Sequence, residues 1–292
     1  MKTLIVGDLH INERSISEID EIFEKDILSI ESDRIIQLGD FFDKNTPTPL
    51  ELKFSSELVL KLKKHYKEVI ILSGTGSHDL LRGTSVIEHL ESLGVKVIKG
   101  DYNEDNLLFG HWMTNESKFE YGTAKHTVTE LKKYKNVFLG HQHNPQIIDD
   151  HIYHIGSIRH VNFNEVDDIK HIVLLEDDRL FFIELKNCIP MKDVTDVTQL
   201  EQIDARTKVR VIFNSFEDYK KNASYVNKIG KKFFLFKLKM NFKDVHKTEH
   251  MSNKMNNASI KLDKSNIITD YIAKIEDKEV RKLLEDQFKE NI

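Results

Sequence analysis

The stretch TLIVGDLH, Thr3 to His10, joins a short apolar run to a glycine and then to an acid and a histidine. The apolar run is typical of a buried strand, and Gly7 allows the sharp turn that would end it. Asp8 and His10 are two residues apart, so their side chains would lie on the same side of an extended chain. The stretch therefore predicts a strand that carries two metal-type ligands at its carboxyl end.

The same unit, an apolar run followed by glycine and an acid or histidine, recurs along the chain. The later copies are RIIQLGD (34–40), EVIILSGTGSHD (68–79), NLLFGH (106–111) and NVFLGHQH (136–143). Taken alone, Asp40 could cap a helix and His111 could be a hydrogen-bonded core histidine. In open α/β sheets, however, ligands gather at the carboxyl ends of strands, and Asp and His are rarely buried without partners. We therefore expect these side chains to converge.

Helix-like segments separate the first strands. Apolar residues recur at helical spacing in SISEIDEIFEKDILSI (15–30) and in PLELKFSSELVLKLKKHYK (49–67). Strands that alternate with helices predict an α/β layer fold. The later runs NVFLGHQH, HIYHIGS, HIVLLE and LFFIELK have less helix between them, and several come close together, which predicts antiparallel pairing on one sheet. The expected fold class is α/β, a layered sandwich of mixed sheets flanked by helices, ending near Cys188.

The chain changes character at Pro190. KVRVIF and KKFFLFKLKM are typical of strands, and a helical pattern lies between them, so a small α+β domain is expected. A polar stretch without periodicity follows and predicts a linker, and the last residues are again helical in pattern. The catalytic domain, the small domain, the linker and the C-terminal helices are expected over residues 1–189, 190–243, 244–265 and 266–292.

The composition is that of an ordinary globular chain, with 292 residues, 39% hydrophobic and 31% charged. Cys188 is the only cysteine, which excludes a disulfide framework and a thiolate metal site and favours a reducing compartment. Asp8 interrupts the N-terminal apolar run too early for a signal peptide, and no run approaches the roughly 20 apolar residues of a membrane span. A cytoplasmic protein is expected, or one in the host cytoplasm if the source is viral.

Charge is distributed unevenly along the sequence. Residues 1–189 carry a net charge of −10, whereas residues 190–292 carry +5. Acidic residues gathered around a site suit cations, and a basic second part suits phosphates. An ordinary solvated surface is the alternative explanation of the same asymmetry.

The ordered set of motifs resembles the calcineurin-like metallophosphoesterase superfamily. The family pattern of D-x-H, G-D-x-x-D, G-N-H-D/E, G-H and G-H-x-H corresponds here to Asp8–His10, Gly39–Asp43, Gly76–Asp79, Gly110–His111 and Gly140–His143. The resemblance covers about residues 1–185 and implies a metallophosphoesterase sandwich. The sequence departs from the pattern in the third motif, where Ser77 stands in place of the asparagine.

Within the superfamily, the sequence is similar to the DNA-repair nucleases, namely SbcD-type nucleases and the recombination nuclease subunit of T-even phages. Lys44 follows the second motif, where protein phosphatases have arginine, and the third motif ends in His-Asp rather than His-Glu. IYHIGSIRHVNFNE (152–165) matches the aromatic, Gly-Ser, Arg and Phe-x-Glu pattern of these nucleases. The small α+β domain then stands where they carry a DNA-capping domain, and Arg159 is a candidate DNA contact.

The resemblance implies a site for two divalent metal ions. One ion would be held by Asp8, His10 and His143, the other by His111 and His141, and Asp40 would bridge the two. A carboxylate can bridge because it has two oxygens. Oxygen and imidazole ligands suit Mn²⁺, with Mg²⁺, Zn²⁺ or Fe²⁺ as alternatives, and the resemblance favours Mn²⁺.

His78 and Asp79 are the expected catalytic pair. In the resembled enzymes this histidine stabilises the charged transition state or protonates the leaving oxygen, and Asp79 would orient it. Ser77 stands where the family asparagine gives an amide oxygen to the second metal. Because a hydroxyl is shorter, Ser77 is expected to coordinate weakly or through a water, with help from Thr75. The expected site is functional, with a second metal that is bound more loosely.

The resemblance also implies partners for the chain. It suggests a DNA exonuclease with endonuclease capacity that acts in recombination or repair. A homodimer is expected through the helices around Leu50–Lys64 and Thr84–Leu93, with apolar surface from Leu58, Leu62, Val86, Ile87 and Leu90. Burial against the sheet explains part of this apolar pattern equally well. The amphipathic segment 266–292 would clasp an ABC-type coiled-coil ATPase of the SbcC type, unless it folds back on its own domain.

Two other functions stay open on the sequence alone. One is a metallophosphoesterase for small phosphodiesters or nucleotides, although such a substrate needs neither the domain after Pro190 nor the Gly-Ser-x-Arg stretch. The other is a non-enzymatic scaffold that presents DNA to a partner, and only Ser77 favours it. Cleavage of linear duplex DNA, compared with cleavage of a small phosphodiester, separates all three.

Overall fold

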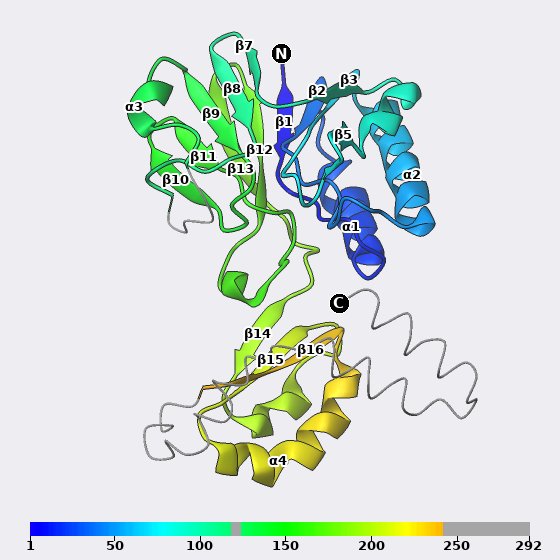
Figure 1. Ribbon diagram of the computed structural model, residues 1–292, viewed down its shortest axis with the longest axis vertical. Helices are drawn as coiled ribbons and strands as arrows, with labels where there is room; N and C mark the ends of the chain where they lie inside the picture. Colours follow the sequence, from blue (N-terminus) through cyan, green and yellow to red (C-terminus); the bar gives the residue numbers. More distant parts are fainter. Residues whose placement is uncertain (118–123, 242–292) are drawn as a thin grey trace, which may run out of the picture. The chain divides into compact units, whose positions relative to one another are not determined.

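The computed structural model describes residues 1–117 and 124–241 (Figure 1). The expected linker and C-terminal helices, residues 244–292, lie outside the described residues. Contacts divide the chain into two units, the first made of residues 1–212 and 224–239 and the second, among the described residues, of 213–223 and 240–241. Across the described ranges, no helix combines the length and apolar character that a membrane span needs.

A six-stranded mixed sheet lies in the first unit, with the strand order β13-β12-β1-β2-β3-β6. Strands β1, β2, β3 and β6 are parallel, and β12 and β13 extend the sheet by antiparallel pairing. The bounds are β1 (Thr3–Val6), β2 (Arg34–Gln37), β3 (Glu68–Leu72), β6 (Lys96–Ile98), β12 (His171–Glu176) and β13 (Arg179–Glu184). The parallel early strands and the antiparallel pairing of HIVLLE with LFFIELK are confirmed. The expectation is wrong for NVFLGHQH and HIYHIGS, whose strands lie in a second sheet and pair parallel to each other.

A five-stranded sheet has the order β10-β11-β9-β8-β7. Strands β8, β9 and β11 are parallel, whereas β7 and β10 pair antiparallel at the two edges. The bounds are β7 (Tyr102–Glu104), β8 (Leu107–Gly110), β9 (Asn136–Leu139), β10 (Gln146–Asp149) and β11 (Ile152–His154). A short hairpin of β4 (Leu80–Leu81) and β5 (Thr84–Ser85) lies apart from both sheets.

The two sheets pack face to face around a buried apolar layer. Ile5 and Ile36 of the six-stranded sheet share this layer with Phe109 of the five-stranded sheet. Alternate residues of β1, Leu4 and Val6, point the other way into the core beneath the helices. Both faces of β1 are therefore buried, which explains why its sequence is a continuous apolar run. The layered α/β fold predicted from the sequence is confirmed.

Helices cover the outer face of the six-stranded sheet, and among the described residues one short helix packs on the five-stranded sheet (Figure 1). Helix α2 (Pro49–His65) begins with a capping box between Thr48 and Glu51 and has proline at its first position. The segment expected as one helix over 15–30 is α1 (Ile16–Ile22) followed by a π-helical turn, η1 (Phe23–Ile27). On the five-stranded sheet, α3 (Val128–Leu131) packs with Val137 and Leu139.

The region after Pro190 contains a three-stranded sheet of order β14-β15-β16. The two strands and the helix expected there are present. The bounds are β14 (Met191–Val194), β15 (Lys208–Phe213), α4 (Phe216–Ile229) and β16 (Leu235–Met240). Short 3₁₀ turns complete the described chain: η2 (Glu88–Leu93), η3 (Phe163–Glu165), η4 (Val197–Gln202) and η5 (Gly230–Lys232).

The residues expected to form a dimer surface lie mostly in the core. Four of them are at most 3% exposed: Leu58, Leu62, Ile87 and Leu90. The helix expected over Thr84–Leu93 is instead strand β5 and turn η2. The helical spacing reflected packing under the six-stranded sheet, so this choice of interface residues is wrong. The exposed apolar residues of α2 are Leu50 and Leu60.

Candidate metal centre and active site

The predicted ligands lie at the carboxyl ends of five parallel strands. Asp8 and His10 follow β1, Asp40 follows β2, and His78 follows β3 in one sheet. His111 follows β8, and His141 and His143 follow β9 in the other sheet. Three overlapping groups have ligand atoms within 4.8 Å of one another: Asp8, His10 and His143; Asp40, His111 and His141; and His10, Asp40 and His78. We call the first two groups the first and the second cluster.

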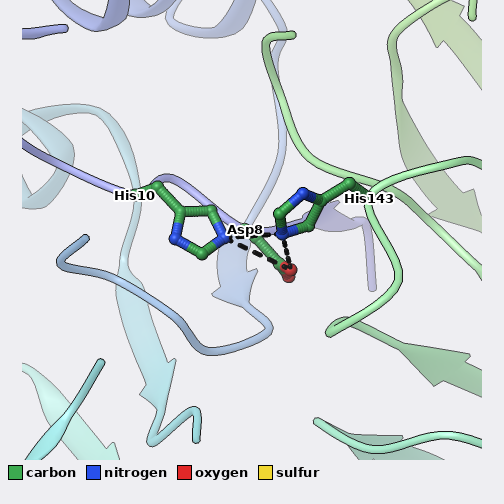
Figure 2. Close-up of side chains that lie close together, drawn as sticks. All are labelled: Asp8, His10 and His143. Atoms are coloured by element: carbon green, nitrogen blue, oxygen red, sulfur yellow. Dashed lines mark hydrogen bonds and ion pairs between the residues drawn. The ribbon is translucent and has the colours of Figure 1, made fainter. Parts of the chain in front are cut away.

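In the first cluster, two imidazoles face each other over a buried carboxylate (Figure 2). The Nε2 atoms of His10 and His143 are 2.8 Å apart. Asp8 Oδ2 lies 4.0 Å from the first of these nitrogens and 3.8 Å from the second. Nδ1 of His143 donates to the carboxylate of Glu165 at 3.1 Å, which leaves the Nε2 lone pair free to bind a metal.

Glu165 and Lys170 form a buried support behind His143. The Lys170 ammonium donates to Glu165 Oε2 at 2.7 Å and to the backbone oxygen of His143 at 2.9 Å. Neither side chain is exposed. Burial alone would raise the pKa of Glu165, but His143 and Lys170 hold it well below its usual range. Glu165 therefore stays ionised, and it fixes the ring of His143.

Arg159, the candidate DNA contact, is 5% exposed, and its guanidinium supports the turn that carries His10. It donates to the backbone oxygens of Leu9 at 3.2 Å and His10 at 2.8 Å. The guanidinium also lies 3.9 Å from the carboxylate of Glu18. Glu18 in turn accepts from Lys208 at 2.9 and 2.7 Å. The contacts of Arg159 are thus those of a positioning residue, and a contact with DNA stays a prediction.

The second cluster is built around a short contact between an imidazole and a carboxylate. Nδ1 of His111 donates to the backbone oxygen of Leu38 at 2.7 Å, which directs Nε2 toward Asp40 Oδ2 at 3.1 Å. Burial lowers the pKa of His111, but the carboxylates of Asp40 and Asp8 outweigh burial and raise the pKa to about 9. Without a metal, a proton on His111 would therefore balance these carboxylates. The backbone N–H of His141 donates to both Asp8 oxygens at 3.2 and 3.1 Å, which links the two clusters.

Ser77 lies on the exposed side of the turn after β3. Its hydroxyl is 3.1 Å from the hydroxyl of Thr75. The Thr75 hydroxyl donates to Asp40 Oδ1 at 3.1 Å, and its backbone N–H donates to the same oxygen at 2.7 Å. Among the described contacts, Ser77 therefore reaches the ligands through Thr75.

His78 and Asp79 have separate partners. Nδ1 of His78 donates to the backbone oxygen of Asp43 at 2.7 Å, and its Nε2 lies 3.9 Å from Asp40 Oδ2. The carboxylate of Asp79 accepts from the backbone N–H groups of Gly74 at 2.7 Å and Phe41 at 3.3 Å. Burial raises the pKa of Asp79 to about 6. The orienting role expected of Asp79 is thus taken by Asp43, while Asp79 joins the second and third motifs through their backbones.

The backbone at three ligands adopts the left-handed conformation that non-glycine residues rarely take. The φ angles are +49° at His10, +46° at Asp40 and +76° at His141. Such strained positions cluster at functional sites because the surrounding structure has to hold them. Two motif glycines are needed for a related reason. A Cβ on Gly39 would lie 2.6 Å from His111 Nδ1, and one on Gly140 would lie 2.6 Å from Asp8 Oδ1.

The residues of both clusters fit divalent metal ions. Burial disfavours the charged form of both residues: it raises the pKa of Asp8 and lowers that of His10 well below its usual range. A bound cation would compensate the buried carboxylate of Asp8, and a neutral His10 has a lone pair with which to bind it. His10 Nδ1 is buried without a hydrogen-bond partner among the described residues. Imidazole and carboxylate ligands in this number suit Mn²⁺, Zn²⁺ or Fe²⁺. The supporting roles of Glu165, Lys170 and Arg159 were not predicted from the sequence. Glu165 and Arg159 nevertheless lie in the stretch 152–165 that resembles the nucleases.

Comparison with known proteins identifies the family. Two solved structures that resemble this one are nuclease MPE from Pseudomonas putida (18% identity, 62% of this chain and 87% of that chain, TM-score 0.31) and the phosphoesterase YfcE from E. coli (15% identity, 64% and 94%, TM-score 0.36). A search of curated proteins finds no match. The family model described as calcineurin-like phosphoesterase matches residues 1–237, which include every ligand of both clusters, and the chain therefore belongs to this family of metal-dependent hydrolases of phosphoester bonds.

Proposed function

We propose that this metallophosphoesterase is a DNA nuclease, an exonuclease with endonuclease capacity that acts in recombination or repair. The observation that supports the proposal is a cavity of about 970 Å³ whose lining includes Asn12, two residues after the ligand His10, although none of the cluster ligands lines it. Asp43 lines it, and the backbone oxygen of this residue also holds His78. A cavity at the upper end of the usual size for a small-molecule site has room for more than one nucleotide.

The charge of the cavity favours a phosphate chain. Arg14, Lys44 and Lys237 line it, are exposed, and form no ion pair among the described residues. Two of the four acids in the lining have other partners, since Glu18 pairs with Lys208 and Glu51 caps α2; the other two are Glu13 and Asp43. Exposed cations that are free to neutralise phosphates supply the sequence-independent part of DNA binding.

The side chains of this site support hydrolysis of a phosphodiester. We propose that the first and second clusters each hold one divalent ion, with Mn²⁺ favoured. When bound, such ions stabilise both the attacking and the leaving oxygens of an in-line displacement. His78 is fixed through Nδ1, so its Nε2 faces the site and can hold a proton for the leaving oxygen or stabilise charge on the phosphate.

Two partners belong to the same proposal. A homodimer would use the exposed apolar side of α2, where Leu50 is 51% and Leu60 46% exposed. Light scattering at micromolar concentration tests this, and a monomer counts against it. An ABC-type coiled-coil ATPase would bind residues 266–292, whose sequence is amphipathic. Deletion of this segment should abolish co-purification with the ATPase and spare the nuclease of the isolated protein; loss of both contradicts the assignment.

Labelled linear duplex DNA with Mn²⁺, beside a small chromogenic phosphodiester, tests the function itself. We expect DNA to be cleaved and EDTA to stop the reaction. Lys44→Gln and Lys237→Gln should each weaken DNA binding and lower the salt slope by about 1, whereas Lys64→Gln, an exposed lysine outside the cavity, should change neither. Hydrolysis of the small ester alone favours the small-substrate alternative, and DNA binding without cleavage of either substrate favours the scaffold.

A further inference from the structure

The turn from Gly74 to Asp79 after β3 carries a chain of two hydroxyl groups that ends on a metal-site carboxylate. Ser77 Oγ and Thr75 Oγ1 are 3.1 Å apart, and Thr75 Oγ1 donates to Asp40 Oδ1 at 3.1 Å. The Thr75 hydroxyl has one proton and donates it to the carboxylate, so Ser77 is the donor in the hydrogen bond between the two hydroxyls. The hydrogen bonds therefore run in one direction, from Ser77 through Thr75 to Asp40.

The two oxygens of Asp40 have different surroundings. Oδ1 accepts the backbone N–H of Thr75 at 2.7 Å as well as its hydroxyl. Oδ2 faces imidazole nitrogens instead, with His111 Nε2 at 3.1 Å and His10 Nε2 at 3.9 Å. His10 belongs to the first cluster and His111 to the second. Asp40 Oδ2 is thus the oxygen that both clusters share, and Oδ1 is engaged by Thr75.

Gly74 gives independent evidence that the turn is built against this carboxylate. A Cβ on Gly74 would lie 2.1 Å from Asp40 Oδ1 and 2.1 Å from the Asp40 backbone nitrogen. No side chain fits there, so glycine lets the next residue bring both of its donors to Oδ1. Asp40 itself is 2% exposed and has a φ angle of +46°, so its own backbone gives it little freedom to adjust.

We propose that Thr75 is the positioning residue of the Asp40 carboxylate, and that Ser77 acts through Thr75 rather than as a direct ligand of the second metal. Two donors on Oδ1 hold the carboxylate plane and present Oδ2 alone to both clusters. This arrangement would let the chain keep a second metal without the amide oxygen of the family asparagine. The inference rests on the proposed two-metal site but not on DNA as its substrate.

Mn²⁺ binding to the metal-free protein, followed by calorimetry and by the spin-coupled Mn–Mn electron paramagnetic resonance signal, tests the inference. Thr75→Val removes the hydroxyl and keeps the backbone N–H. We expect the second Mn²⁺ to bind about 10–100-fold more weakly and the coupled signal to disappear at stoichiometric metal, as is typical when a group that orients a ligand is lost. Thr75→Ser retains a hydroxyl and should stay within about threefold of the wild type.

Ser77→Ala is the matched variant. It removes the outer hydroxyl only, so it should weaken the second Mn²⁺ by less than Thr75→Val and leave the coupled signal intact. A larger loss in Ser77→Ala than in Thr75→Val makes Ser77 the ligand and overturns the proposal. If Thr75→Val does not fold by circular dichroism, loss of the coupled signal in Ser77→Ala overturns the proposal and its retention supports it.

The wild-type protein separates this inference from the proposed function. Binding of a single Mn²⁺ overturns the two-metal site and the role of Thr75 together. Two bound Mn²⁺ ions without DNA cleavage leave the Thr75 inference standing and remove the nuclease proposal. If the wild type binds two ions and cleaves DNA, and Thr75→Val changes neither the affinity for the second Mn²⁺ nor the coupled signal, only the Thr75 inference is overturned.

Discussion

The two ligand clusters are similar in composition but are supported in different ways. In the first cluster, His143 is held by Glu165 and His10 by Arg159, and both supports are at most 5% exposed. In the second cluster, the Asp40 carboxylate is held by Thr75, from a turn whose next hydroxyl, that of Ser77, is exposed. Buried charged supports fix ligand geometry more firmly than a half-buried hydroxyl whose own partner is exposed. We therefore expect the first cluster to bind its metal ion more tightly than the second, because the residues that support its ligands are buried and charged.

The largest expected effect comes from His78, which lies with a ligand of each cluster. His78→Ala should lower the cleavage rate about 10²–10³-fold in saturating Mn²⁺, because a group aimed at the transition state is lost. Metal stoichiometry should not change. His65→Ala, an exposed histidine at the end of α2, is the control. Loss of a bound Mn²⁺ in His78→Ala would instead make His78 a ligand, and the division into two clusters would have to be redrawn.

A smaller effect is expected from the support of the first cluster. Glu165→Gln should weaken the tighter Mn²⁺ about 10–100-fold and spare the weaker one, as measured by calorimetry. Asp168→Asn is the matched control, because Asp168 lies 3.5 Å from Lys170 but has no contact with His143. The double variant Glu165→Gln/Lys170→Met removes both charges of the buried ion pair, so neither charge is left buried without its partner. If this variant folds but still binds the tighter Mn²⁺ weakly, the loss comes from the orientation of His143 and not from unfolding. Equal weakening of both ions would contradict the comparison.

The smallest effect should come from repairing the second cluster. Ser77→Asn restores the amide oxygen of the family motif and should lower the Mn²⁺ concentration for half-maximal activity by up to about tenfold, or roughly 1.4 kcal/mol. Ser92→Asn, at an exposed serine away from the site, should have no effect. If Ser77→Asn needs more metal while its circular dichroism is unchanged, the turn is adapted to serine, and the second cluster is complete as it stands.

Much of the site follows from the sequence because its ligands obey a local rule. Each ligand comes shortly after an apolar strand, and parallel strands end at one edge of a sheet. The same locality explains the fold, since runs such as TLIV at Thr3–Val6 and HIVLLE at His171–Glu176 carry their own signal. The mixed sheets and their flanking helices could be predicted for this reason.

The supporting contacts could not be predicted because they join distant parts of the chain. Arg159 reaches the backbone of Leu9 across 150 residues, and no spacing in the sequence records that contact. The sequence makes Arg159 a candidate DNA contact because it lies in the stretch that resembles the nucleases, and that resemblance does not reveal its partners inside the fold. Helical spacing misled at Leu58 and Ile87 for a related reason, since the same apolar stripe serves a core or an interface. Only the burial of each side chain distinguishes the two.

The ion pair between Glu18 and Lys208 restricts which parts of this chain could be exchanged during evolution. Glu18 is buried on α1 and Lys208 is buried on β15, 190 residues later. Removal of one partner of such a pair typically costs about 3–5 kcal/mol, a large part of the usual stability of a folded protein. A descendant that replaced everything after Pro190 would therefore have to bring a cation to the same position. Genetic exchange should move the catalytic sheets and β15 together, even though the sequence changes character before that strand begins.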